Sequence, residues 1–314
     1  MIRKLPVGLG DIAGFIPAAR RDILDERDRY KIDERFIVEK TGFRRLSYSA
    51  GADCVSLAEM AVRQLAEKDT SLLKRIRLLV VVTQNPDFQG LPHTSALLAS
   101  KLELSKEVAA FDIGLGCSGW VYGISVAAGF MEANAIEEGL LITVDPYSRI
   151  IDENDRDTSV LFGDAASATI LTCRLPRWRL GRSVFGTDGS QASSLMKLPD
   201  ARLKMNGRAI FNFSATQVPP AIEKVLELNT LEWSQIDKVV LHQGSRFIVD
   251  TIGKRLGYPE RTPFLAGDYG NTVSSSIPLL FAEGHFANDR CLLTAGFGVG
   301  LSWAATALFR HEES

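Results

Sequence analysis

Cys117 is the candidate nucleophile of this sequence. An apolar, strand-like run ends at Gly116, the cysteine follows, and Ser118 and Gly119 lead into small and apolar residues over 121–131 that predict a helix. The sequence thus predicts a thiol on a strand-to-helix turn. Backbone N–H groups and the helix dipole favour the nucleophilic thiolate at such a turn, although a structural role remains an alternative for this cysteine taken alone.

The other three cysteines have simpler interpretations. Cys173 ends one apolar run, Cys291 begins another, and Cys54 precedes a helix start without a glycine-framed turn. No Cys-x-x-Cys pair is present, which argues against a zinc ribbon or a disulfide framework. We therefore expect a reducing, cytoplasmic environment.

A cysteine nucleophile needs a base or fixed dipoles, and His242 is the best placed of the four histidines. It directly follows the strand-like run 239–241, and ligand sites in α/β sheets lie beyond the carboxyl ends of strands. The alternative is that His242 caps the next helix. His93 lies in a loop, and His285 has the surroundings of an exposed helix end.

Asn271 and a glycine string complete the set of candidates. Gly270-Asn271 alone is a common turn signal, and Asn271 could simply cap a helix. A serine-rich segment ending at Pro278 follows it and favours a closely packed site. Glycines at 296, 298 and 300 would let backbone N–H groups approach a ligand oxygen closely.

Composition limits the classes of function. The chain has 314 residues, 46% of them hydrophobic, which is enough for one large domain or two packed halves. A net charge of −2 without a long basic block argues against nucleic acid as the main partner. Pro6 and Gly8 interrupt any signal-peptide core, and the apolar runs are too short to span a bilayer, so we expect no membrane segment.

Alternating helices and buried strands predict an α/β architecture. A Phe-Gly pair leads to an alanine-containing strand both at 162–171 and at 297–308, which suggests a duplication, with 174–190 as the seam. Helices are predicted at 56–67 (capping-box spacing of Ser56 and Glu59), 94–104, 118–134, 219–228 and 247–256, and strands at 76–83, 108–113, 139–144, 167–173, 236–241 and 291–295.

Together the motifs resemble the thiolase superfamily and, more narrowly, the β-ketoacyl-[acyl carrier protein] synthase III family. The resemblance extends from Lys40 to Trp303. Its motifs are 40–44, Asp112, 116–119, 162–164, 242–243, 270–272 and 298–300. It implies a duplicated fold in which two βαβαβαββ halves, residues 1–174 and 175–314, pack as a five-layer α-β-α-β-α sandwich.

The resemblance also implies a two-stage reaction. Cys117 would be acylated by an acyl-CoA, with the backbone N–H groups of Cys117 and Gly300 as the oxyanion hole. His242 and Asn271 would then stabilise the enolate formed when malonyl-acyl carrier protein loses CO2. That enolate would attack the acyl-Cys117 thioester and give a β-ketoacyl product of fatty-acid biosynthesis, with no metal or cofactor beyond these substrates.

The expected pantetheine entrance departs from the family pattern. Phe36 and Lys40 stand where the family has tryptophan and arginine, and phenylalanine stacks more weakly while lysine offers only a point charge. Family members commonly have His-Gln-Ala-Asn where this chain has 242–245. We expect the condensing chemistry to survive with altered donor recognition, toward a longer or unusual acyl-CoA or an acyl-carrier protein. The entrance residues implied are Phe36, Lys40, Thr41, Arg156, Ser245, Arg246 and Phe247.

Leu91 matches a family phenylalanine that reaches into the neighbouring subunit's acyl pocket, and the resemblance implies a homodimer. Two other functions stay open on the sequence. One is a related thiolase-fold acyltransferase acting on another acceptor in secondary metabolism. The other is a non-catalytic acyl-binding subunit, which would not need the thiol. A cysteine protease would explain neither the glycine string nor the small-residue helix.

Overall fold

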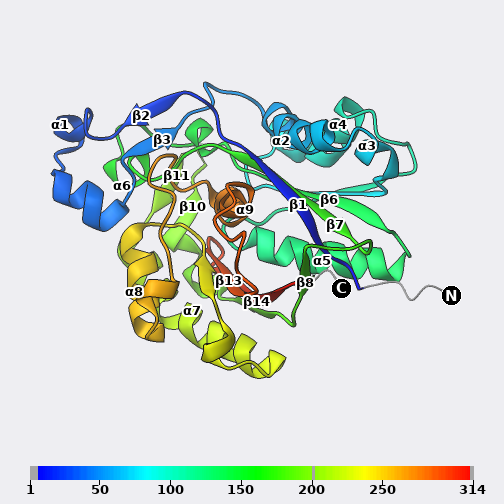
Figure 1. Ribbon diagram of the computed structural model, residues 1–314. Coiled ribbons are helices and arrows are strands. Elements are labelled where there is room, and N and C mark those ends of the chain that lie inside the picture. The colour runs from blue at the N-terminus through cyan, green and yellow to red at the C-terminus, as the bar shows by residue number, and fades with distance from the viewer. Residues whose placement is uncertain (1–5, 200–201, 312–314) are drawn as a thin grey trace.

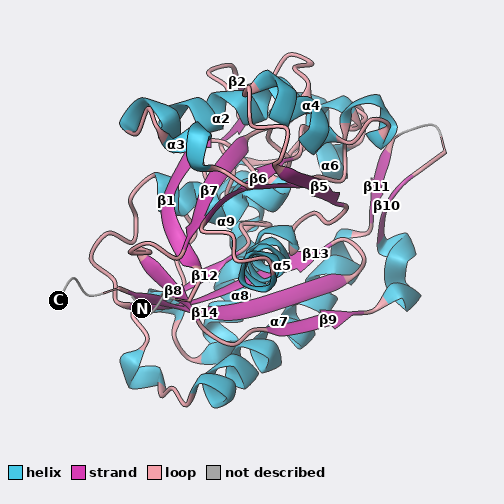
Figure 2. Cartoon of the chain, turned by 90° about the vertical axis from the view of Figure 1, so that its right-hand side faces the viewer, coloured by secondary structure: helices cyan, strands magenta, loops and turns pink. Residues whose placement is uncertain are grey.

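Two sheets and three layers of helices alternate through the molecule (Figures 1 and 2). The computed structural model describes residues 6–199 and 202–311. Helices cover the outer face of each sheet, and a central layer of helices lies between the sheets. This is the five-layer α-β-α-β-α arrangement that the sequence resemblance implies.

The first sheet belongs to the N-terminal half. Its strand order is β1-β7-β6-β4-β5, with β4 parallel to both β5 and β6 and with β7 antiparallel to β6 and β1. All five residues of β4 are buried, because the strand has helices on both faces. The strands are β1 (Gly8–Phe15), β4 (Leu78–Val82), β5 (Ala109–Ile113), β6 (Glu138–Val144) and β7 (Ala166–Thr172), and the outer helices are α2 (Cys54–Lys68), α3 (Leu72–Arg75) and α4 (Thr94–Lys101).

The second sheet repeats part of this plan. A parallel pair, β12 and β13, is followed by the antiparallel β14, as β4 and β6 are followed by β7. The short β8 pairs with both β14 and β1 and joins the two sheets along one edge. The elements are β8 (Trp178–Leu180), β9 (Val184–Thr187), β12 (Lys238–Leu241), β13 (Cys291–Gly298), β14 (Ser302–Arg310), α7 (Gly207–Asn229) and α8 (Arg246–Leu256).

The repeat is incomplete. In the first half β5 follows β4 and α4. The corresponding segment of the second half, residues 262–267 after β12 and α8, forms no strand. The predicted boundary at 174/175 falls between β7 and β8, and the expected seam contains β8 and β9. Remaining elements are β2 (Arg20–Asp22), β3 (Arg45–Ser47), β10 (Leu195–Lys197), β11 (Leu203–Met205), α1 (Arg27–Tyr30), α6 (Arg156–Ser159), the π-helix η1 (Phe36–Thr41) and the 3-10 helices η2 (Asp87–Gly90), η3 (Tyr147–Arg149), η4 (Gly189–Ser194), η5 (Trp233–Gln235), η6 (Pro259–Arg261) and η7 (Val273–Ser275).

The central layer consists of α5 (Gly119–Ala133) and α9 (Ser276–Ala282). Figure 2 shows α5 end-on between the two sheets. Glycines let α5 lie very close to the first sheet: a Cβ at Gly119 would lie 2.4 Å from Val82 Cγ1, and one at Gly123 would lie 2.8 Å from Leu141 Cδ1. Because α5 begins directly after the cysteine turn, this packing fixes the position of Cys117.

Two predicted helix starts were wrong. The N-cap of α2 is Asp53, whose carboxylate accepts the N–H of Ser56 at 2.6 Å, so Ser56 and Glu59 do not form the predicted capping box. The predicted helix 219–228 is the second half of α7, which begins at Gly207 and continues through Pro219 and Pro220.

A tertiary contact lets α7 continue through its prolines. Pro219 has no N–H for the carbonyl of Ala215, one turn earlier. Arg255 of α8 donates to that carbonyl at 2.7 Å. The carbonyl is therefore satisfied from outside the helix.

Among the described residues, no helix has the length and apolar character needed to cross a bilayer.

We expect Gly123→Ala to lower the free energy of unfolding by about 1–3 kcal/mol, because the added methyl group overpacks α5 against Leu141. The matched control is Gly129→Ala in the same helix, where nothing lies within 4 Å of the new Cβ. That variant should gain up to about 1 kcal/mol from helix propensity. Urea unfolding followed by circular dichroism measures both, and equal stability of the two variants would contradict the packing argument.

Candidate active site

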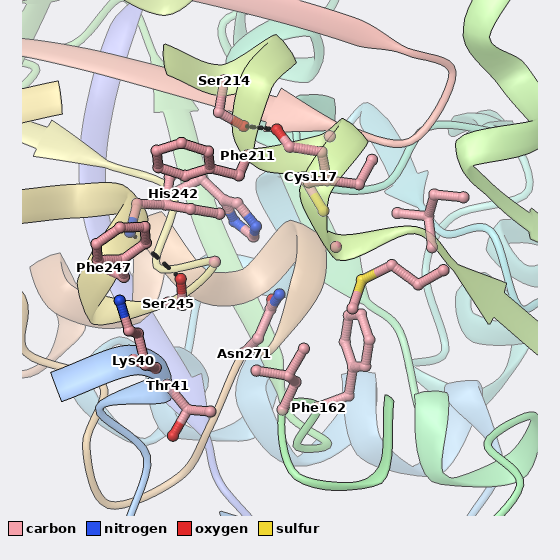
Figure 3. A pocket seen from close by; sticks show the side chains of 18 of the residues that line it. Lys40, Thr41, Cys117, Phe162, Phe211, Ser214, His242, Ser245, Phe247 and Asn271 are labelled. Carbon is pink, nitrogen blue, oxygen red and sulfur yellow. Dashed lines mark hydrogen bonds between the residues drawn. The ribbon is translucent and has the colours of Figure 1, made fainter. Parts of the chain in front are cut away.

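One apolar cavity of about 250 Å³ collects most of the predicted site. The sulfur of Cys117, the imidazole of His242 and the amide of Asn271 face the same central space (Figure 3). These three residues are 5%, 2% and 5% exposed. The other lining residues are Phe36, Lys40, Thr41, Leu161, Phe162, Leu195, Met205, Gly207, Ile210, Phe211, Ser214, Gly244, Ser245, Phe247, Ile248, Phe297 and Gly298.

Cys117 lies on the turn between β5 and α5, as predicted. The turn is closed by the N–H of Gly119, which donates to the carbonyl of Gly116 at 2.7 Å. Ser118 is the N-cap residue of α5, so the thiol lies just before the positive end of the helix.

The C-terminal half contributes backbone to the same turn. A Cβ at Gly298, the last residue of β13, would lie 2.8 Å from the Cys117 sulfur. A Cβ at Gly296 would lie 2.6 Å from the Cys117 carbonyl oxygen. Only glycine permits this approach, and the backbone N–H of Val299, the next residue, is among the groups that favour the Cys117 thiolate.

Burial dominates the acidity of the thiol. It raises the pKa of Cys117 to about 12, the charge of the buried Asp145 acts in the same direction, and the backbone N–H groups of Val299 and Cys117 oppose both. Burial thus outweighs the expected stabilisation of the thiolate by the helix terminus. At neutral pH the resting nucleophile is a thiol.

His242 follows β12 directly, and its backbone N–H donates to the backbone carbonyl of Ala295 on β13 at 2.9 Å. The imidazole meets the edge of the Phe297 ring, with centroids 5.5 Å apart and planes at 89°. Burial lowers the pKa of His242 to about 3, so the ring is neutral at physiological pH. Its Nδ1 lies 2.7 Å from the hydroxyl oxygen of Ser276, which leaves Nε2 for the pocket.

Asn271 is held by the loop that precedes β7. Its backbone N–H donates to the carbonyl of Leu161 at 2.8 Å, and its backbone carbonyl accepts the N–H of Gly163 at 3.0 Å. The side-chain Oδ1 accepts the N–H of Val273 at 2.9 Å. With the oxygen occupied, the amide NH2 group is the end that can donate to a ligand.

Three successive serines connect Asn271 to the rest of the site, and all three are buried. The hydroxyl of Ser274 donates to the carboxylate of Asp145. Ser275 donates to the carbonyl of Thr143 at 3.0 Å, and Ser276 meets His242. Each hydroxyl has its own partner, so the segment that carries the amide is fixed to β6 and to the imidazole.

The expected entrance residues divide into two groups. Phe36, Lys40 and Thr41 on η1 and Ser245 and Phe247 at the start of α8 line the cavity. Ser245 is also the N-cap of α8 and accepts the N–H of Ile248 at 3.3 Å. Arg156 and Arg246 lie outside the lining, against the rings of Phe36 and Phe264 at 5.9 Å and 4.6 Å.

Two other predicted residues are not in the cavity lining. Leu91 is 85% exposed on the surface of the chain. Gly300 is one residue beyond Val299, whose backbone N–H is the one that acts on the sulfur. The roles predicted for both remain predictions.

Sequence reasoning missed the wall made by α7 and the adjacent hairpin. Ile210, Phe211 and Ser214 line the cavity from the first turns of α7, which the sequence prediction started twelve residues too late. Asn206, whose side chain accepts the N–H of Ala209, is the N-cap that could have revealed this start. Within the described residues, no group of three His, Cys, Asp or Glu side chains could hold a metal ion.

Family models match both halves of the chain. The model for 3-oxoacyl-[acyl-carrier-protein (ACP)] synthase III matches residues 111–189, and the model for its C-terminal part matches residues 226–309. A β-ketoacyl-[acyl-carrier-protein] synthase III of Streptococcus agalactiae is 32% identical over 289 residues, which cover 86% of this chain and 88% of that relative.

Solved structures of the same family are similar to this chain over nearly its whole length. A 2.1 Å crystal structure of a 3-oxoacyl-(acyl-carrier-protein) synthase III is 33% identical, with a TM-score of 0.90, covering 98% of this chain and 100% of the other. The β-ketoacyl-[acyl-carrier-protein] synthase III of Thermus thermophilus is 30% identical, with a TM-score of 0.89 and the same coverage.

We expect Gly298→Ala to slow covalent modification of Cys117 by about a hundredfold or more, because the new methyl group would lie 2.8 Å from the sulfur and displace it. Alkylation by iodoacetamide, followed by intact-protein mass, gives the rate. Gly189→Ala is the control, since nothing lies within 4 Å of a Cβ there. A Gly298→Ala protein that is alkylated as fast as the control would refute the close approach.

Proposed function

Because this chain belongs to the β-ketoacyl-[acyl-carrier-protein] synthase III family, we propose that it condenses an acyl thioester with malonyl-[acyl carrier protein]. The product is a β-ketoacyl-[acyl carrier protein] of fatty-acid biosynthesis. The single observation that carries the proposal is the convergence of Cys117, His242 and Asn271 on one buried cavity. The proposed reaction uses no cofactor or metal, only the CoA and carrier-protein thioesters as substrates.

In the first stage the Cys117 sulfur attacks the thioester carbonyl of an acyl-CoA. The bond to the CoA sulfur breaks, and the thiol proton leaves with the departing CoA. In this proposal the backbone N–H groups of Cys117 and Gly300 stabilise the oxyanion. The backbone N–H of Val299, one residue before Gly300, favours the Cys117 thiolate and adds to the same set of donors.

In the second stage the malonyl thioester loses CO2, and its enolate carbon attacks the acyl-Cys117 carbonyl. Two neutral donors, an imidazole N–H of His242 and the amide of Asn271, stabilise the enolate oxygen. Burial supports this role, because a pKa of about 3 keeps His242 uncharged while leaving one ring N–H. Fixed donors in a dry site need no reorganisation as the charge develops.

Ser276 positions the imidazole. The Ser276 hydroxyl oxygen lies 2.7 Å from Nδ1 and 3.4 Å from the backbone nitrogen of Gln243. In the proposed mechanism the hydroxyl donates to Nδ1, which leaves the ring proton on Nε2, facing the cavity. Ser276 is thus a positioning residue and not a catalytic one.

We propose that the protein works as a homodimer in the cytoplasm. β5 is paired on one side only, and all five of its residues are half-buried at the edge of the first sheet. The nearby loop exposes Phe88 and Leu91 at 72% and 85%, surfaces that a second subunit would cover. Four free cysteines suit a reducing compartment.

We expect Cys117→Ala to abolish acylation by acyl-CoA, since the variant lacks the nucleophile. His242→Ala and Asn271→Ala should keep most of the acylation but lower condensation about 10²–10³-fold, because each loses one enolate donor. Intact-protein mass measures acylation. Labelled CO2 and the β-ketoacyl product measure condensation with malonyl-[acyl carrier protein].

Ser276→Ala should reduce condensation less than His242→Ala and leave acylation unchanged, a separation that general destabilisation would not produce. Release of CO2 without a new carbon–carbon bond in the wild-type protein would contradict the synthase assignment. So would acylation of the Cys117→Ala variant at an undiminished rate.

Size-exclusion chromatography with light scattering should give a mass near twice the 34.4 kDa of one chain. Leu91→Asp places a charge on the exposed loop and should weaken the dimer. Phe185→Asp, at another exposed aromatic residue far along the chain, serves as the comparison. A monomeric wild-type protein at micromolar concentration would contradict the dimer.

A further inference from the structure

Three cations surround the mouth of the cavity, and each lies on an aromatic ring. Lys40 Nζ is 3.8 Å from the centroid of Phe247. Arg246 lies over Phe264, and the more exposed Arg156 lies over Phe36 and within 3.7 Å of its neighbour Asp157. Arg246 Nε is buried without a hydrogen-bond partner among the described residues. The mouth therefore carries positive charge that its own carboxylates largely leave uncompensated.

Lys40 and Phe247 belong to a column that crosses three elements. Phe211 of α7 stacks on Phe247 of α8, with centroids 4.9 Å apart and planes at 25°. Lys40 of η1 covers Phe247 from the other direction, and Figure 3 shows the three side chains in one line beside the cavity. All three line the cavity, and the partly exposed Phe247 ring lies where the cavity meets solvent.

The contact of Lys40 with the Phe247 ring is easier to break than the stacking of Phe211 on that ring. Phe247 is 39% exposed, and a cation–π contact at an exposed site is readily exchanged for a charge-assisted hydrogen bond to phosphate. A phosphate at the mouth would draw the Lys40 ammonium away from the ring. Phe247 would then be held by Phe211 alone.

We propose that Lys40, Phe247 and Phe211 form a gate that selects thioesters carrying a phosphate on the pantetheine chain. Without phosphate, the column narrows the mouth. With phosphate, Lys40 moves to the anion, Phe247 turns aside, and the chain reaches Cys117. The proposal rests on the function proposed above and adds what separates phosphate-bearing thioesters from phosphate-free ones, which is Phe247 coupled to Lys40 and not the charge of Lys40 alone.

The test compares octanoyl-CoA, octanoyl-[acyl carrier protein] and the phosphate-free octanoyl-N-acetylcysteamine. Acylation of Cys117 is followed by intact-protein mass in wild type, Phe247→Ala, Lys40→Met and the control Lys254→Met, an exposed α8 residue outside the cavity lining. We expect both gate variants to accept the phosphate-free thioester at least about fivefold faster than wild type. The CoA and carrier-protein arms show which source of phosphate opens the gate.

Lys40→Met gives the sharpest outcome. If Lys40 were only a charge contact, this variant would slow the two phosphorylated donors and leave the phosphate-free rate unchanged, which would overturn the gate. An unchanged phosphate-free rate in Phe247→Ala would overturn it as well. Thermal unfolding of each variant confirms that the comparison is made on folded protein.

A second readout separates the gate from the proposed enzymatic function. Alkylation of Cys117 by N-phenylmaleimide, a bulky reagent, should be faster in both gate variants, while the smaller iodoacetamide is little affected. Inorganic phosphate, at constant ionic strength, should raise the maleimide rate at least about twofold in wild type but not in Lys40→Met. If Cys117 is not acylated but the maleimide rates differ between variants as expected, the proposed synthase function is wrong and the gate stands. If the maleimide rates are equal in all variants, the gate is wrong.

Discussion

The contact on which the site depends is the one between the end of β13 and the turn that carries Cys117. Glycines at 296 and 298 let backbone from the C-terminal half lie against the nucleophile from the N-terminal half. Val299, the residue after Gly298, contributes a backbone N–H that favours the Cys117 thiolate. Neither half holds a complete site, because the thiol comes from one and the imidazole and carboxamide come from the other.

Burial has opposite consequences for the two titratable groups of the site. It raises the pKa of Cys117, so the thiol does not ionise freely at neutral pH. It lowers the pKa of His242, so the ring remains a neutral donor. A dry pocket thus suits the enolate stage directly. The acylation stage depends on the incoming thioester and the oxyanion donors to stabilise the negative charge that develops as sulfur attacks.

Local signals in the sequence predicted the α/β layering, and the three central residues that the sequence singled out line one cavity. Buried β-branched runs marked β4 and β6, and the glycine-flanked Cys117 marked its turn. The prediction for α7 failed at Pro219, since the contact that makes the proline tolerable joins Arg255 to Ala215, 40 residues apart in sequence. With the start of α7 misplaced, Phe211 could not be assigned to the cavity.

The resemblance carried the sequence analysis further than residue patterns alone could. It correctly implied the five-layer fold and the family. Family models match segments of both halves, and a curated relative is 32% identical. It named Phe36, Lys40 and Phe247 as entrance residues, and all three line the cavity, while their role in binding stays a prediction. What it could not show is that Lys40 rests on Phe247, because a contact between η1 and α8 has no signature along the chain.

The three hydroxyls after Asn271 also limit how this region can evolve. Each serine has a different partner, so the spacing of the segment matters as much as its residue types. An insertion or deletion of one residue would rotate every later side chain, by about 120° per residue in the 3-10 helix η7 and by about 100° in α9. Descendants of this chain can therefore exchange individual residues here one at a time, whereas a change in length would detach the amide and the imidazole from their supports together.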